Sequence, residues 1–248
     1  MRKTIFKLAA VGVAMSTMAI ASPAFAQETG TPDKAEVEAP KGAEGPITIT
    51  GGATVVSDYR FRGVSLSDKD FALQPTLTIS HESGLYVGVW ASNIADNTGD
   101  DLEVDLYAGF SGGDAITYDI GATYYVYPGI SGLNYVEVTG KLGTTFGPAT
   151  VGAQVSYVPS QDNTGTSDNI YVGTNASIGL PDSPISIVGS VGFEDGAFGD
   201  DKIDWTLGLT AAVAGFTVGA SYVDTNRNTT FAFKDSSVGV VFSLSYFF

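Results

Sequence analysis

The chain has 248 residues and carries 27 acidic residues against 12 basic ones, a net charge of −15, with no cysteine. Nucleic-acid binding depends on clustered Lys and Arg, and a chain this acidic is a poor candidate for it. We therefore expect no nucleic-acid partner. The lack of cysteine excludes a disulfide framework and a thiol nucleophile.

The first residues have the pattern of an export signal. Arg2, Lys3 and Lys7 surround the start of a short apolar core at 8–20, and Ala-Phe-Ala at 24–26 fits a cleavage site. This pattern predicts a cleaved secretory signal peptide over 1–26, because the core is shorter than the roughly 20 apolar residues of a spanning helix. Its removal takes three basic and no acidic residues and lowers the net charge from −15 to −18.

Residues 27–46 are rich in Glu, Pro, Gly and Ala and have no apolar periodicity, which predicts a flexible linker. The remaining residues, 47–248, alternate between apolar and polar side chains in short segments. Period-two alternation is typical of strands with one apolar face. Twelve strands are predicted, near 47–62, 71–80, 85–93, 102–111, 115–127, 134–146, 149–158, 169–179, 185–192, 203–212, 216–224 and 237–248. The third is ambiguous, because Tyr86 and Trp90 lie opposite Leu85, Val87 and Val89.

The connections between the predicted strands alternate in length. Those after even-numbered strands are short (HESG, GGD, GP, LPDSP, VAG), and those after odd-numbered strands are mostly longer and polar (GVSLSDKD, NIADNTGDD, PGISGL, PSQDNTGTSDN, FEDGAFGDD, TNRNTTFAFKDS). This alternation predicts an all-β transmembrane antiparallel up-and-down barrel of about 12 strands, with short periplasmic turns and longer external loops.

A soluble β-sandwich is the alternative fold. It would not need the alternation of loop lengths, and it gives no reason for aromatic residues near strand ends. In a barrel such residues form interfacial girdles. Candidates are Phe61, Phe71, Tyr157, Trp205, Tyr222 and Phe248.

In a barrel the polar side of each strand faces the lumen. The side chains predicted there, as pore-lining or selectivity residues, are Asp58, Arg60, Arg62, Glu103, Asp105, Glu137, Lys141 and Asp204. Two arginines opposed by carboxylates would set a transverse field that selects solutes, or would brace a closed barrel as an internal ion-pair network. The sequence leaves both open. Twelve strands lie between filled eight-stranded and open sixteen-stranded barrels, so any channel is narrow, and no long constriction loop is expected.

Catalytic and metal-binding patterns are weak. The one histidine, His81, lies in the turn SHESG beside Glu82, a poor place for a catalytic base. The last loop has oxygen ligands at Asp224, Asn226, Asn228 and Asp235, but Thr229 occupies the position where a calcium loop needs Gly. We expect no enzyme activity, no cofactor and no specific metal site, with divalent ions bridging acidic loops to lipopolysaccharide only non-specifically.

The final strand has an apolar face made by Phe242, Leu244, Tyr246 and Phe248. This pattern resembles the C-terminal signal that the outer-membrane barrel-assembly machinery recognises, so we expect that machinery to be a partner.

Residues 57–93, SDYRFRGVSLSDKDFALQPTLTISHESGLYVGVWASN, with LEVDLYAGF and YDIGATYYVYPG, resemble the TorF family of porin-like proteobacterial outer-membrane proteins. The matching motifs fall on Ser57, Asp58, Tyr59, Phe61, Arg62, Gly63, Ser65, Glu103, Asp105, Tyr125, Tyr127, Pro128 and Gly129. The resemblance implies an outer-membrane porin and supplies no substrate.

Together these patterns predict a barrel that is exported and inserted into the outer membrane, in contact with lipid and lipopolysaccharide. The expected function is a narrow passive channel for small hydrophilic solutes or ions. The alternative is a closed structural or surface-interaction barrel, whose acidic loops bind divalent ions, lipopolysaccharide or partners.

Overall fold

The computed structural model describes residues 46–95, 101–129, 132–226 and 238–248. The predicted signal peptide, and the predicted linker except for Pro46, lie outside the described residues. Within the described ranges no helix is long and apolar enough to cross a membrane.

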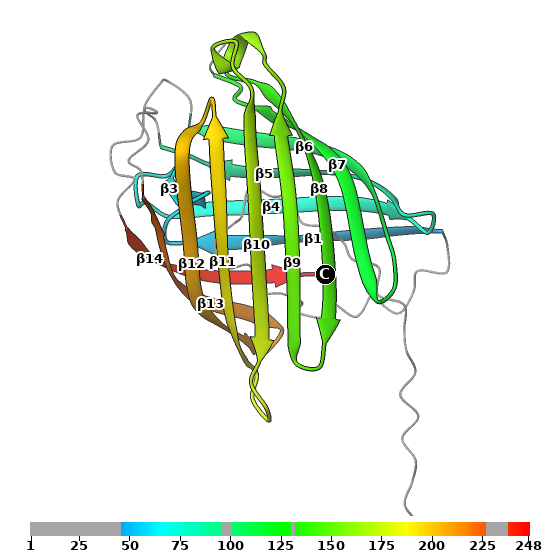
Figure 1. Ribbon diagram of the computed structural model, residues 1–248. Coiled ribbons are helices and arrows are strands. Elements are labelled where there is room, and N and C mark those ends of the chain that lie inside the picture. Colours follow the sequence, from blue (N-terminus) through cyan, green and yellow to red (C-terminus); the bar gives the residue numbers. More distant parts are fainter. Residues whose placement is uncertain (1–45, 96–100, 130–131, 227–237) are drawn as a thin grey trace, which may run out of the picture.

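Twelve antiparallel strands form one closed barrel, in which each strand pairs with its neighbours along the chain and β1 closes the ring against β14. This confirms the predicted fold. In Figure 1, β8–β12 run upright while β1, β4, β5 and β6 cross behind them, as strong strand tilt requires. The barrel strands are β1 (Ile47–Val56), β4 (Ala72–His81), β5 (Leu85–Asn93), β6 (Leu102–Gly112), β7 (Ile116–Val126), β8 (Tyr135–Phe146), β9 (Ala149–Val158), β10 (Asn169–Gly179), β11 (Ile185–Gly196), β12 (Gly199–Val213), β13 (Phe216–Thr225) and β14 (Gly239–Phe247).

Side-chain alternation separates an apolar outer surface from a polar lumen. On β14, Phe242 is 59% exposed on the outside, whereas Ser245 is 2% exposed on the inside. On β6, Leu106 is 50% exposed and Asp105 is fully buried. The ambiguous third strand follows the same rule, with Trp90 buried toward the lumen and Val87 exposed. The apolar outside is the surface that a barrel presents to lipid.

The connections divide the barrel into two ends. At the short-turn end the strands are joined by residues 82–84, 113–115, 147–148, 180–184 and 214–215, as predicted. At the opposite, long-loop end the connections are residues 57–71, 94–101, 127–134, 159–168, 197–198 and 226–238.

The β11–β12 connection at the long-loop end differs from the prediction. FEDGAFGDD was expected to be a long loop, but β11 and β12 run on through most of it and leave only residues 197–198 between them. Alternation continues at the start of this stretch, with Phe193 exposed and Glu194 buried, and resumes just after it, with Lys202 buried and Ile203 exposed. Gly196, at φ 125°, adopts the left-handed region that the turn requires.

The first strand also ends earlier than predicted. β1 stops at Val56 instead of continuing to residue 62, and most of residues 57–67 lie buried inside the barrel, while residues 69–71 return to the surface. We call residues 57–71 the inward segment. It contains a two-stranded hairpin of β2 (Arg60–Phe61) and β3 (Val64–Ser65). A connection folded inside the barrel was not expected from the sequence.

Candidate functional site

The hairpin of the inward segment is built around a turn that only certain residues tolerate. Arg62 and Gly63 have φ of 48° and 83°, and they connect the paired residues Phe61 and Val64. Two central residues with positive φ are the mark of a type I′ hairpin turn. The turn places Arg62 at the tip of the hairpin, inside the barrel. Phe61 consequently lies in the lumen against Tyr125 and is not part of an outer aromatic girdle.

Asp58 organises the base of the hairpin. Its carboxylate accepts a hydrogen bond from Ser65 Oγ at 2.6 Å and an ion-paired one from Arg60 Nε at 2.6 Å. Arg60 Nη1 also donates to the Gly63 carbonyl at 3.1 Å. The Arg60 charge is thus matched inside the inward segment and does not reach across the lumen.

Arg62 crosses to the opposite wall. Its Nη1 lies 2.7 Å from Glu194 Oε1 on β11, and its Nη2 lies 2.8 Å from Glu137 Oε2 on β8. The guanidinium stacks over the Tyr171 ring of β10 at 4.2 Å from the centroid. Lys202 of β12 pairs with Glu194 and donates to the Arg62 carbonyl. Charge-assisted hydrogen bonds of this kind, in a site screened from water, fix both position and orientation.

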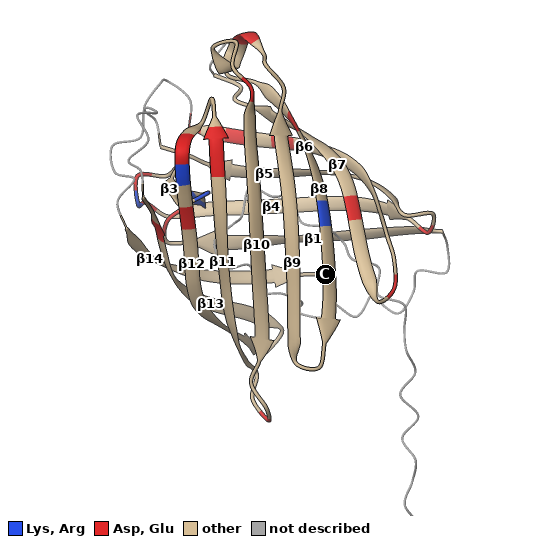
Figure 2. Cartoon of the chain, in the orientation of Figure 1, with Lys and Arg blue, Asp and Glu red and all other residues tan. Residues whose placement is uncertain are grey.

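Figure 2 shows that the charged positions of β11 and β12 gather at the end where these two strands are joined to each other. The Arg62 contacts therefore lie in the long-loop half of the lumen. A second ion pair, between Lys141 Nζ and Asp119 Oδ1 at 3.4 Å, joins β8 to β7.

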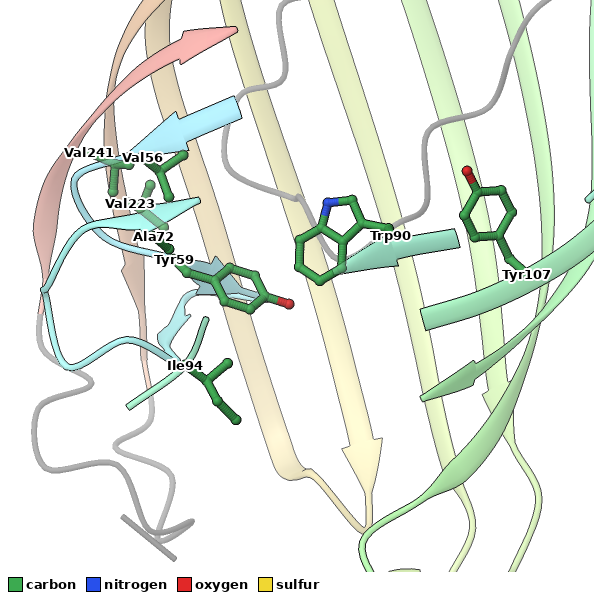
Figure 3. Packing of buried hydrophobic residues seen from close by; sticks show 8 residues of the cluster. All are labelled: Val56, Tyr59, Ala72, Trp90, Ile94, Tyr107, Val223 and Val241. Atoms are coloured by element: carbon green, nitrogen blue, oxygen red, sulfur yellow. The ribbon is translucent and has the colours of Figure 1, made fainter. Parts of the chain in front are cut away.

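An apolar cluster anchors the other side of the inward segment. Tyr59 is fully buried, with its ring centroid 5.4 Å from that of Trp90. Figure 3 shows the Tyr59 hydroxyl directed away from Val56 and Val223 and toward the side where Trp90 lies. The hydroxyl donates to Glu103 Oε1 at 3.1 Å. Burial, reinforced by the negative charge of Glu103, raises the pKa of Tyr59 well above its ordinary value, so it remains a neutral donor.

Further along the lumen, tyrosine rings lie flat over glycines of neighbouring strands. Tyr107 covers Gly88, and Tyr171 covers Gly192, because a β-carbon at either glycine would overlap the ring. The rest of this wall is hydroxyl- and amide-rich, including Thr78, Thr139, Gln154, Ser156, Thr206, Thr210, Ser221 and Ser245. Such a lining suits water and small polar solutes.

All eight predicted lumen residues are buried or nearly so inside the barrel: Asp58, Arg60, Arg62, Glu103, Asp105, Glu137, Lys141 and Asp204. The structure brings Arg62 to Glu137 and Arg60 to Asp58, and it places Lys141 apart, with Asp119. Whether these residues select solutes remains a prediction.

Sequence reasoning missed three members of the site: Asp119, Glu194 and Lys202. Glu194 fell in the predicted loop FEDGAFGDD, and Lys202 fell between that loop and the next predicted strand. The signal is confined to the two ends of the connection, where Phe193 alternates with Glu194 and Lys202 alternates with Ile203. Between them the alternation breaks, and the register of β11 against β12 shifts between Glu194 and Gly196. Asp119 lies in register with Thr117 and Gly121 on the lumen face of β7, a pattern visible in the sequence.

The predicted assembly residues Phe242, Leu244, Tyr246 and Phe248 are 59%, 46%, 49% and 56% exposed on the outer surface. His81 is the exposed last residue of β4, beside the turn, with Nδ1 2.9 Å from Ser83 Oγ. Of the other predicted girdle residues, Phe71, Tyr157, Tyr222 and Phe248 are exposed.

Comparisons with known proteins give a family and a fold. A family model described as "Bacterial protein of unknown function (Gcw_chp)" matches residues 40–244. No curated protein sequence matches the chain. The solved structure of the KdgM porin superposes with a TM-score of 0.55 at 7% identity, over 79% of this chain and 98% of that one. The NanC porin superposes with a TM-score of 0.52 at 9% identity, over 80% and 98%. At such low identity these likenesses show a shared fold, that of outer-membrane barrels.

Proposed function

Since the chain belongs to the Gcw_chp family of bacterial proteins of unknown function and has the fold of outer-membrane porins, we propose that it is a narrow passive channel for small hydrophilic solutes or ions. The observation that carries the proposal is the contrast between an apolar outer surface and a lumen lined by polar and charged side chains. The resemblance of residues 57–93 to TorF porins supports the same function, and no catalytic activity is proposed.

The proposed location is the outer membrane, reached by export with cleavage of residues 1–26 and insertion by the barrel-assembly machinery. The exposed apolar side chains of all twelve strands would face lipid, and the long-loop end would face lipopolysaccharide. The apolar band of the barrel surface supports the proposal of lipid and lipopolysaccharide as partners.

The inward segment is the proposed constriction. It is held at its tip by Arg62 and at its base by Asp58 and Arg60, all of them buried. A loop folded into a barrel narrows the path and determines which solutes pass. The arginines therefore act here mainly by positioning the constriction, because the charge of each is matched by carboxylates.

Planar-bilayer conductance tests the proposal. The purified full-length barrel is compared with the Arg60→Ala/Arg62→Ala variant and with Lys69→Ala, which removes a cation from an exposed position of the same segment. We expect discrete, small conductance steps for the wild type and for Lys69→Ala. The double variant should show larger steps and a stronger cation preference, because the constriction loosens and the carboxylates lose their partners.

A well-folded wild-type barrel without discrete conductance would refute the channel. An unchanged step size and ion preference in the double variant would refute only the assignment of the constriction.

The second candidate function is a closed barrel that acts in structure or surface interaction. The complete burial of Tyr59, Arg60 and Ser65 inside the lumen favours it, because a tightly packed inward segment blocks a path. Silent wild-type barrels together with conducting Arg60→Ala/Arg62→Ala barrels would support this candidate.

A further inference from the structure

The buried charges of the lumen do not balance. Among the described residues, seven buried carboxylates face four buried or nearly buried cations. The carboxylates are Asp58, Glu103, Asp105, Asp119, Glu137, Glu194 and Asp204, and the cations are Arg60, Arg62, Lys141 and Lys202.

The four cations pair with carboxylates that lie outside β6. The ion pairs are Arg60–Asp58, Arg62–Glu137, Arg62–Glu194, Lys202–Glu194 and Lys141–Asp119. The two acids of β6, Glu103 and Asp105, belong to none of these pairs. Their part of the negative charge is therefore not offset by an ion pair.

Asp105 is the more isolated of the two acids. It is fully buried, and neither of its carboxyl oxygens has a hydrogen-bond partner. Glu103 points to the same side of β6, two residues away, and accepts a hydrogen bond from the Tyr59 hydroxyl at 3.1 Å. Burying an ionised carboxylate without a partner costs far more free energy than burying a neutral carboxyl group.

A proton fits beside Asp105, whereas a metal ion does not. Among the described residues, no three His, Cys, Asp or Glu side chains form a group that could hold a metal. The oxygens of Asp105 are closed off from solvent, which leaves no space for the water ligands of a hard cation. A proton needs no such space, and it removes the charge that burial disfavours.

The titratable groups around Asp105 cannot offset its charge. Those that act on it electrostatically are Tyr59 of the inward segment, Glu103 on the same strand, Tyr125 on β7, Tyr127 after β7, and Tyr135 and Glu137 on β8. The tyrosines are neutral and the two glutamates are acids. The hairpin tip nearby directs Arg62 to Glu137 and Glu194 instead.

The inward segment covers this part of the lumen wall. Trp90 on β5 lies directly opposite Asp105, and the Tyr59 ring packs on Trp90 with 5.4 Å between centroids (Figure 3). The sheet pairing of the inward segment itself is limited to the two-residue strands β2 and β3, whereas β5 and β6 are paired along their length. The inward segment is therefore the part of this packing that yields most easily.

We propose that Asp105 is a pH-sensitive lock on the inward segment. When Asp105 is protonated, Tyr59 and Trp90 close over a neutral group. When the proton passes to water at higher pH, the carboxylate has to be hydrated, so water enters past Tyr59 and Trp90 and the inward segment loosens. As regulation of a channel the lock rests on the proposed function, but the movement of the segment does not.

Acrylamide quenching of Trp90 fluorescence tests the movement. The chain has two tryptophans, so Trp205→Phe on β12 leaves Trp90 as the single tryptophan. The folded full-length barrel in detergent is compared at about pH 6 and about pH 9, a range in which buried carboxyl groups ionise and tyrosine stays neutral. The quenching constant should rise several-fold at the higher pH.

Asp105→Asn in the Trp205→Phe background keeps the shape of the side chain and cannot ionise, so its quenching should stay low at both pH values. One control is Asp182→Asn, an exposed turn residue at φ 54°, a conformation that Asn tolerates. The other is His81→Gln, because histidine changes charge in the same range and His81 is the only one in the chain. Both controls should respond as the background does.

Infrared spectroscopy of the wild type is a second measurement that needs no substitution. It should show the band of a protonated carboxyl group at the lower pH and lose that band at the higher pH. Equal quenching at both pH values, or no such band at the lower pH, would overturn the lock. A quenching response that persists in Asp105→Asn would assign it to another group and would also overturn the lock.

Conductance at the same two pH values separates the lock from the channel. Larger steps at the higher pH in the wild type, and unchanged steps in Asp105→Asn, are expected. Barrels that are silent at both pH values while Trp90 quenching responds would refute the channel and support the movement. Conducting barrels whose steps and quenching are both independent of pH would refute the lock and leave the channel.

Discussion

Arg62 at the tip of the inward segment and Glu194 near the end of β11 form a buried ion pair across the lumen, with Nη1 and Oε1 2.7 Å apart although 132 positions separate the residues. The pair ties the first connection of the chain to a strand on the opposite wall. A small barrel with a polar interior has little apolar core, so such contacts have a large share in fixing the inward segment.

Replacing Arg62 by Met should lower the free energy of unfolding by about 3–5 kcal/mol, because it leaves buried carboxylates without their partner. Urea unfolding in lipid vesicles, followed by tryptophan fluorescence, measures the change. Combining Arg62→Met with Glu194→Gln should cost less than the sum of the single changes, by about 0.5–3 kcal/mol. Additive effects would show that the two side chains are not coupled.

Gly192→Ala should destabilise the barrel by about 1–3 kcal/mol, because the new methyl group would overlap the Tyr171 ring that lies under Arg62. Gly140→Ala is the control, since no atom lies within 4 Å of a β-carbon built there. Thermal unfolding of the two variants in detergent measures the difference. In a Tyr171→Ala background, Gly192→Ala should be nearly neutral, and a full effect there would contradict the contact.

Tyr59→Phe removes the hydroxyl that is donated to Glu103 and should cost about 1 kcal/mol at neutral pH. Because the folded pKa of Tyr59 is raised above the unfolded value of about 10, the stabilisation is present below that pH and is lost as pH rises above it. The wild type should therefore lose stability more steeply than Tyr59→Phe above about pH 10. Parallel urea titrations across this range measure both slopes, and equal slopes would mean that Tyr59 ionises freely.

Phe248→Ser should reduce insertion into the outer membrane several-fold. Its backbone N–H and carbonyl pair with Gly51 at 2.9 and 3.0 Å and are retained, so the change removes only the exposed ring. Phe146→Ser is the matched control, a similarly exposed aromatic residue at the same end of the barrel that lies on β8. The heat-modifiable fraction in cell envelopes measures folded barrel. An equal loss in both variants would assign the effect to general hydrophobicity instead of recognition of the final strand.

Most of the barrel could be predicted from the sequence because strand alternation is a local property. Leu102, Val104 and Leu106 face lipid, and Glu103 and Asp105 face the lumen, whatever the neighbouring strands are. The short turns also depend on local sequence, and their positions match the prediction. The same rule, with the predicted strands 185–192 and 203–212 each extended by one or two residues, would also have placed Glu194 and Lys202 on the lumen face.

The sequence alone determined the strand count, the apolar outer surface and which charges face inward, because each depends on residues two positions apart. Only the tertiary structure decided that Asp58–Arg62 leaves the sheet. Alternation alone would extend a strand through these residues. The left-handed turn at Arg62 and Gly63 becomes favourable because Glu137 and Glu194, on distant strands, pair with the Arg62 guanidinium. Which charges pair across the lumen depends on how the barrel closes. Closure therefore determined which carboxylates have a cationic partner, and it left Glu103 and Asp105 without a protein cation.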